Sequence, residues 1–281
     1  DLHTAYRRQR QMCIRDSAIG GSTNGLVHLT AIAGRMGIQL DMDSFDALSR
    51  DIPVIVDLKP SGEGYMEDLH KAGGLPRILM ELKDKLHLDT HTITGKTLGE
   101  IIDETNFSWK QKIVKSAGNP VYREGGIAVL KGNLAPNTAI IKQSAASDSL
   151  LTHTGRAVVF DGLEDLANRI DSEDLDVNED DILVLRYIGP KGAPGMPEAG
   201  LIPIPKKLAK KGVKDMVRIS DGRMSGTASG TIILHVCPEA ADGGPLALVK
   251  SGDIISLDVA ARNLHLHVDE QELEKRNKSL D

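Results

Sequence analysis

Two glycine-rich loops of this 281-residue chain carry the side chains best suited to chemistry. Glycines recur too often in both for a helix or strand interior, so each loop is predicted to be a shaped turn. The candidate residues are Glu198 in the first loop (residues 187–200), and Asp221, Arg223 and Ser225 in the second (residues 218–230). Together they offer a metal ligand, a nucleophile or base, and charged groups that orient a substrate. Two ordinary turns are the alternative interpretation.

A third candidate is the segment GGSTN at residues 20–24, where glycines precede a helical period of apolar residues. Ser22 or Thr23 is predicted to cap this helix, with Asn24 directly after them. Free backbone N–H groups at the positive end of a helix dipole suit a carboxylate or a phosphate. Ordinary helix capping explains the same residues.

Composition narrows the classes of partner. A formal charge of -6 gives no general attraction to nucleic acid or to an anionic membrane, so a small molecule is the expected partner. No apolar run approaches the roughly 20 residues that span a bilayer. Only two cysteines occur, Cys13 and Cys237, without the spacing of a disulfide scaffold or a zinc module. We therefore predict a cytoplasmic protein.

Residues 1–17, DLHTAYRRQRQMCIRDS, differ in character from the rest of the chain. They contain a cluster of arginines and no apolar period, and RRQRQMCIRDS resembles translated sequencing-adapter read-through. We predict that this leader is non-native and lies outside the fold. A basic arm that binds nucleic acid is the alternative.

From residue 18 to residue 110 the pattern is typical of an α/β unit. A short helix capped by Asp43 or Ser44 is predicted to precede a buried strand at residues 52–58. Further helices are expected at residues 66–72, after Pro76, and at residues 94–102. The last of these contains GKT without the upstream glycine of a phosphate-binding loop, which excludes a P-loop NTPase.

After a predicted linker at residues 111–125, short β-like runs dominate residues 126–281 and indicate a β-rich sandwich or barrel-like domain. The runs are 127–132, 138–142, 156–160, 181–187, 216–220, 231–236, 253–259 and 264–268. Helices are expected at residues 163–170 and 245–250. His265 and His267 alternate with leucines on one strand face, where either a polar face or a metal pair is consistent with the pattern.

Seven segments in order resemble the dihydroxy-acid dehydratase and phosphogluconate dehydratase family. They are GGSTN (20–24), KPSG...MEDLHKAGGLP (59–76), TGKTL (94–98), GGIAVLKGNLAP (125–136), GPKGAPGMPE (189–198), SDGRMSG (220–226) and PEAADGGPLALVKSGD (238–253). The resemblance implies the C-terminal part of an α/β domain, followed by a barrel-like (swivelling) domain. It also implies a homo-oligomer.

The resemblance implies a hydro-lyase that removes water from a 2,3-dihydroxy acid and yields a 2-keto acid. The loop sequences around Glu198 and Ser225 are more similar to dehydratases of sugar acids, such as arabinonate or xylonate. The alternatives are the dihydroxy-acid dehydratase of valine and isoleucine synthesis, and a non-catalytic β-rich binding module.

Site roles also follow from the resemblance. Ser225 corresponds to the base that takes the C2 proton, and Glu198 corresponds to a carboxylate ligand of Mg²⁺. Arg223 and Asp221 are expected to fix the turn or to orient the substrate. The family uses Mg²⁺ and an iron–sulfur cluster held by cysteines, whereas Cys13 and Cys237 lie outside the cluster motifs. Cys237 is expected to be a buried thiol at a strand end. We therefore expect this chain to be inactive alone.

Overall fold

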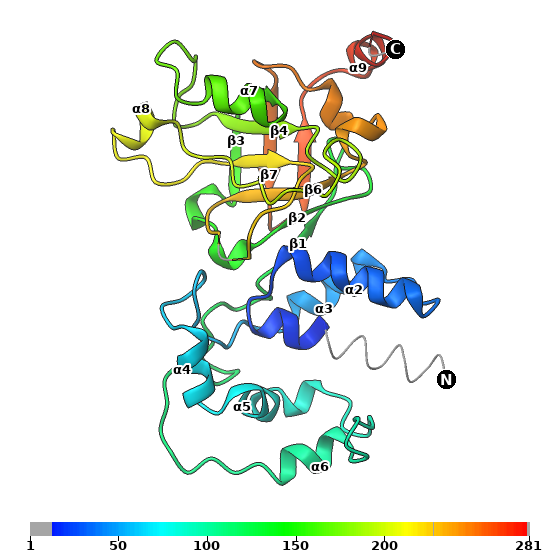
Figure 1. The fold of residues 1–281 in the computed structure, drawn as a ribbon, viewed down its shortest axis with the longest axis vertical. Helices are drawn as coiled ribbons and strands as arrows, with labels where there is room; N and C mark the ends of the chain where they lie inside the picture. The colour runs from blue at the N-terminus through cyan, green and yellow to red at the C-terminus, as the bar shows by residue number, and fades with distance from the viewer. Residues whose placement is uncertain (1–12, 227, 280–281) are drawn as a thin grey trace. The chain divides into compact units, whose positions relative to one another are not determined.

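The computed structural model describes residues 13–226 and 228–279. Two compact units divide the chain, Asp1–Ile127 and Ala128–Asp281. The fold is mixed α/β, with helices in the first unit and an eight-stranded sheet in the second (Figure 1). Across these described residues, no helix has both the length and the apolar character that a membrane span requires.

Capping side chains begin several helices of the first unit. Its elements are α2 (Thr23–Arg35), α3 (Met42–Arg50), α4 (Met66–Lys71), α5 (Gly74–Glu81), the 3-10 helix η1 (Lys83–Lys85) and α6 (Leu98–Asp103). The predicted Ser22 cap of α2 is confirmed, because its hydroxyl accepts the Asn24 N–H at 3.2 Å. The predicted cap of α3 at Asp43 or Ser44 is wrong. Asp41 caps this helix and accepts the N–H groups of both residues.

The buried strand predicted at residues 52–58 does not form. Val54 and Val56 are buried, as the apolar run suggested, but each makes only an isolated bridge, to Tyr122 and Val114 respectively. These partners come from an irregular segment, which cannot supply the regular ladder that defines a strand. An apolar run therefore predicted the burial correctly and the secondary structure incorrectly.

Part of the predicted leader belongs to the fold, which corrects the expectation that residues 1–17 lie outside it. Residues 13–18 are helical, and Cys13 and Ile14 are 1% and 3% exposed. Ile14 packs in the same apolar cluster as Ile55 and Leu82. Residues 1–12 lie outside the described residues.

The second unit is a mixed β-sheet that curls into a nearly closed barrel (Figure 1). Its strands are β1 (Ala128–Leu130), β2 (Thr138–Ile141), β3 (Thr152–Asp161), β4 (Ile182–Arg186), β5 (Arg218–Ser220), β6 (Ile232–Cys237), β7 (Ile254–Asp258) and β8 (Asn263–Leu266). Their order is β1-β2-β6-β5-β4-β3-β7-β8. Strands β3, β4, β5 and β6 run parallel, and antiparallel pairs flank them. Each of the eight predicted runs overlaps one strand, but β3 begins four residues before its predicted run, and β6 and β8 each extend one residue beyond theirs.

Closure of the barrel depends on the segment directly after β1. The Lys131 N–H donates to the Arg262 carbonyl at 2.9 Å, and the Leu264 N–H donates to the Lys131 carbonyl at 2.8 Å. Gly132 follows at a point where a Cβ atom would lie 2.0 Å from the Leu264 carbonyl oxygen. A glycine is needed here because the two edge strands approach so closely.

Apolar side chains of the strands alternate between the barrel interior and its outer face. On β3, Ala157 and Val159 contribute to the interior cluster, whereas Val158 and Phe160 face the outer cluster with α7 (Gly162–Arg169). This period of two is the one expected of a strand that is covered on both faces. The remaining elements are η2 (Gln143–Ala145), η3 (Asp148–Leu150), α8 (Lys206–Ala209), η4 (Ala240–Asp242), η5 (Pro245–Leu248) and α9 (Glu270–Asn277). Residues 245–248 form a 3-10 helix where a helix was predicted.

Candidate functional site

The two candidate loops leave the same edge of the barrel. Strands β4 and β5 are adjacent and parallel, with Leu185 opposite Ser220, so the segments that follow them emerge side by side. Loops positioned by a rigid sheet in this way are frequent places for catalysis. The shared edge is a product of strand order, which the separate motifs do not reveal.

Asp221 ties the bases of these loops together. Its carboxylate accepts the N–H groups of Tyr187 and Ile188, both at 3.1 Å, and that of Ala240 at 3.0 Å. The residue is 2% exposed. Burial raises the pKa of this carboxyl above its ordinary value, although the three N–H groups oppose the shift. These contacts are those of a residue that fixes turns.

Arg223 joins the second loop to the first. Its Nε donates to the Met196 carbonyl at 2.6 Å, and its own carbonyl accepts the Gly200 N–H at 2.7 Å. The guanidinium Nη1 lies 3.8 Å from Glu198 Oε1, with the two side chains 29% and 44% exposed. The structure thus brings Arg223 and Glu198 together as a partly exposed charge pair.

Ser225 lies two residues beyond Arg223 on the same loop and is half-buried. Its carbonyl accepts the Ala228 N–H at 3.1 Å. Met224 and Ala228 pack with Ile232 and Leu234 of β6, so apolar contacts anchor the loop on both sides of Ser225. The loop therefore holds a half-buried serine between two apolar anchors.

His235 on β6 was missed by the sequence analysis. Its Nε2 atom is buried and has no hydrogen-bond partner among the described residues. Leaving a buried polar atom unpaired costs about 1–3 kcal/mol. Burial, and then the charge of Arg223, lower the pKa of His235 to about 4, so the imidazole is neutral at pH 7. A single histidine in an apolar strand carries no sequence signal for this arrangement.

The GGSTN residues belong to the first unit. The Ser22 hydroxyl is engaged in capping α2, Thr23 is 2% exposed, and Asn24 occupies the second helical position. The four candidates at the ends of β4 and β5 belong to the second unit. The capping role of Ser22 is observed, and the role of these residues in anion binding stays a prediction.

The described residues do not complete a site for an iron–sulfur cluster or for Mg²⁺. They contain no group of three or more His, Cys, Asp or Glu side chains arranged to hold a metal. Cys13 and Cys237 belong to different units, and a cluster requires several thiolates. The Glu198 carboxylate is a suitable oxygen ligand for Mg²⁺, but a single carboxylate does not make a complete Mg²⁺ site.

The two thiols are expected to react at different rates. Cys13 is 1% exposed, and burial, followed by the Asp16 carboxylate, raises its pKa to about 11. Cys237 is only half-buried, which corrects the expectation of a buried thiol. Because the thiolate is the reactive species, Ellman's reagent at neutral pH should modify Cys237 rapidly and Cys13 only after denaturation. Equal rates for Cys237→Ser and Cys13→Ser variants would contradict this prediction.

The strand-face histidines of the second unit do share one face. The rings of His265 and His267 lie edge to face with centroids 4.8 Å apart. The His267 Nε2 lies 2.7 Å from Ser256 Oγ, which in turn lies 2.7 Å from Thr154 Oγ1. This pattern is a cross-strand hydrogen-bonded chain.

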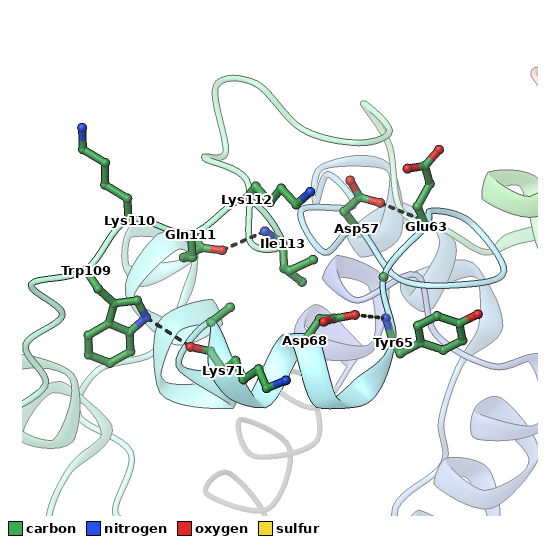
Figure 2. Close-up of a pocket in the computed structure, with 12 residues that line it drawn as sticks. Asp57, Glu63, Tyr65, Asp68, Lys71, Trp109, Lys110, Gln111, Lys112 and Ile113 are labelled. Atoms are coloured by element: carbon green, nitrogen blue, oxygen red, sulfur yellow. Dashed lines mark hydrogen bonds between the residues drawn. The ribbon is translucent and has the colours of Figure 1, made fainter.

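A pocket of about 550 Å³ lies in the first unit (Figure 2). Its polar groups hold neighbouring backbone: the Asp68 carboxylate accepts the Tyr65 N–H at 2.8 Å, and the Trp109 indole N–H donates to the Lys71 carbonyl at 3.1 Å. The Gln111 side chain likewise accepts a nearby backbone N–H at 2.9 Å. These contacts shape the loops around the pocket.

Comparison with known proteins agrees with the motifs. The model of the dihydroxy-acid/6-phosphogluconate dehydratase C-terminal domain matches residues 112–281, and that of the N-terminal domain matches residues 11–101. The second match begins within the predicted leader. It therefore supports the correction made from the packing of Ile14.

Several curated relatives are similar over most of this chain. An L-arabinonate dehydratase from Rhizobium leguminosarum bv. trifolii is 51% identical over 264 residues, which are 93% of this chain and 45% of the relative. An L-arabonate dehydratase from Azospirillum brasilense is 48% identical over 95% of this chain and 46% of its own length. A dihydroxy-acid dehydratase from Methanococcoides burtonii is 45% identical over 93% of this chain and 47% of its own length. The chain spans about half the length of the curated relatives it matches.

The family models match parts of both units, and the C-terminal match includes both candidate loops. On this basis, the chain belongs to the dihydroxy-acid/6-phosphogluconate dehydratase family.

Proposed function

We propose that this chain supplies the Ser225 loop of a hydro-lyase that converts a 2,3-dihydroxy sugar acid into a 2-keto-3-deoxy acid. One observation carries the proposal: Asp221 and Arg223 join the loops after β4 and β5, and Ser225 lies half-buried on the joined segment. The names of the L-arabinonate and L-arabonate dehydratases that it resembles favour a pentonate as the substrate.

The reaction removes a hydrogen from C2 and the hydroxyl from C3, and the resulting enol tautomerises to the keto acid. Ser225 Oγ, as an alkoxide, is proposed to take the C2 proton. A serine hydroxyl is a weak base at neutral pH, so the alkoxide requires nearby positive charge. We assign only this proton transfer to the serine.

Arg223 and Glu198 are proposed to organise the charge around the serine. The guanidinium contributes positive charge two residues before Ser225, and a substrate carboxylate is the kind of group that an arginine binds. Glu198 lies beside Arg223, where it is half exposed and able to bind a cation. Asp221 is proposed to hold both loops in register.

A hybrid enzyme tests the proposal directly. Residues 18–281 of this chain would replace the matching region of the R. leguminosarum relative, which leaves that protein's own remaining half in place. After anaerobic iron–sulfur reconstitution with Mg²⁺, the hybrid is expected to convert L-arabinonate into a keto acid, detected as its semicarbazone. The 281-residue chain alone is expected to give no product.

The panel of substrates separates the alternatives. Faster turnover of 2,3-dihydroxyisovalerate than of L-arabinonate or D-xylonate would identify a dihydroxy-acid dehydratase. The name of the M. burtonii relative supports this alternative. A folded hybrid that turns over none of these acids would overturn the proposed function and favour a binding module.

A further inference from the structure

We propose that His235 is a further substrate-contacting residue, whose imidazole Nε2 forms a hydrogen bond with an oxygen of the 2,3-dihydroxy acid. The inference rests on the proposed function, because it places the acid beside the loop that carries Ser225. It adds a group from β6 to a site otherwise built from the loops after β4 and β5.

A β-bulge sets the position of His235. Ile140 pairs with Leu234 and Thr138 pairs with Cys237, so one residue of β2 lies opposite two residues of β6, His235 and Val236. Bulges redirect a side chain and often lie next to active sites. The ladder is therefore interrupted at the one histidine of this strand.

The backbone of His235 also departs from strand geometry. Its φ is 53°, in the left-handed region that residues other than glycine rarely adopt. Its N–H donates to the Gly222 carbonyl at 3.1 Å, which ties the bulge to the loop between Asp221 and Arg223. A conformation of this kind persists only where surrounding contacts hold it, and such strain gathers at functional sites.

The orphaned nitrogen identifies the kind of group that it binds. The Nε2 atom is buried without a partner among the residues that the structure describes, and such exceptions call for an explanation. Because the imidazole is neutral, its two ring nitrogens are one donor and one acceptor. A hydroxyl or carboxylate oxygen of a sugar acid is a matching partner.

Other histidines of the second unit differ from His235. The His267 Nε2 contacts Ser256 Oγ at 2.7 Å, and the His153 Nε2 contacts the Asp180 carbonyl at 2.8 Å. Each of these two rings therefore has a hydrogen-bond partner within the protein itself. His267 consequently serves as a matched control.

Imidazole NMR of the 281-residue chain tests the proposal. With ¹⁵N-labelled histidine and Mg²⁺ present, addition of L-arabinonate is expected to shift the His235 ring resonances and to leave those of His267 unchanged. The His235→Gln variant assigns the signal. In His235→Phe, the apparent Kd for L-arabinonate should rise about tenfold, as expected for loss of one hydrogen bond.

Partial recovery of affinity in a conservative variant distinguishes a substrate contact of His235 from a purely structural role. His235→Gln keeps an amide that can donate and accept, so it should recover part of the lost affinity, whereas His235→Phe keeps only bulk. A purely structural role would lower the melting temperature of both variants and leave the Kd of the folded protein unchanged. The His267→Phe control is expected to bind as the unchanged chain does.

Two outcomes separate the inference from the proposed function. If the backbone amides around Arg223 shift with L-arabinonate while His235 does not, or if His235→Phe binds normally, the inference is overturned and the function stands. If neither the loop amides nor His235 respond, while the hybrid enzyme is also inactive, both are overturned. Turnover by the hybrid without any response at His235 overturns the inference alone.

Discussion

Replacing Ser225 with alanine in the hybrid enzyme is expected to lower kcat for L-arabinonate by about 10³-fold, within the range that a positioned base contributes. The alanine keeps the loop's apolar anchors, Met224 and Ala228, and removes only the oxygen that takes the C2 proton. KM should change little, because binding by Arg223 is retained. Keto-acid formation and cluster absorbance would be measured on the same samples.

A second serine of the loop provides the control. Ser229 is exposed and lies four residues beyond Ser225, so Ser229→Ala makes the same chemical change away from the proposed proton transfer. It should leave kcat unaltered. Exchange of the C2 hydrogen with deuterated solvent, followed by NMR, would show whether Ser225→Ala stops proton removal itself. Full activity in Ser225→Ala would exclude this serine as the base.

Replacing Asp215 with alanine is expected to destabilise the barrel by about 3–5 kcal/mol, the usual result of removing one member of a buried ion pair. The Asp215 carboxylate accepts from Arg218 Nη2 at 2.6 Å, from Ser147 Oγ at 2.7 Å and from the Thr231 N–H at 2.9 Å. The side chains of Asp215 and Arg218 are 11% and 4% exposed, respectively. The variant leaves Arg218 buried without its counter-ion.

Urea unfolding of the 281-residue chain would measure this loss. Trp109 is the only tryptophan and belongs to the first unit, so its fluorescence reports that unit, whereas far-ultraviolet circular dichroism also reports the barrel. The circular dichroism midpoint should fall in Asp215→Ala. In Asp171→Asn, which removes an exposed partner of Lys206, the midpoint should not move. Equal midpoints for the two variants would contradict the prediction.

The Asp215 carboxylate is also expected to make the stability of the folded chain depend on pH. Burial alone would raise the pKa of Asp215, but hydrogen bonds from Ser147 and Thr231 and the charge of Arg218 hold it below its ordinary value of 3.8. The unfolded chain therefore binds this proton more readily, and the stabilisation is present above pH 3.8 and lost as pH falls through the folded-state pKa. The difference between the unchanged chain and Asp215→Ala should shrink on acidification.

Local patterns were sufficient for much of the fold. All eight runs of β-branched and apolar residues overlap strands, because a covered strand needs such side chains at consecutive positions. The cap of α2 was predicted at Ser22 or Thr23, because a short polar side chain before an apolar period satisfies a free N–H group, and the structure shows Ser22 in this role. Sequence patterns failed at residues 52–58, where burial without a regular partner produced isolated bridges.

The sequence by itself determined the family, the order of the strands along the chain and the residues Glu198, Arg223 and Ser225 as candidates, since each depends on local residue types and motifs. The tertiary structure alone decided the order of the strands within the barrel, the joining of the two loops by Asp221 and Arg223, and the burial of the His235 Nε2 atom. These features depend on contacts between residues far apart in sequence. A linear pattern shows which groups are available, and only the folded chain shows which of them meet.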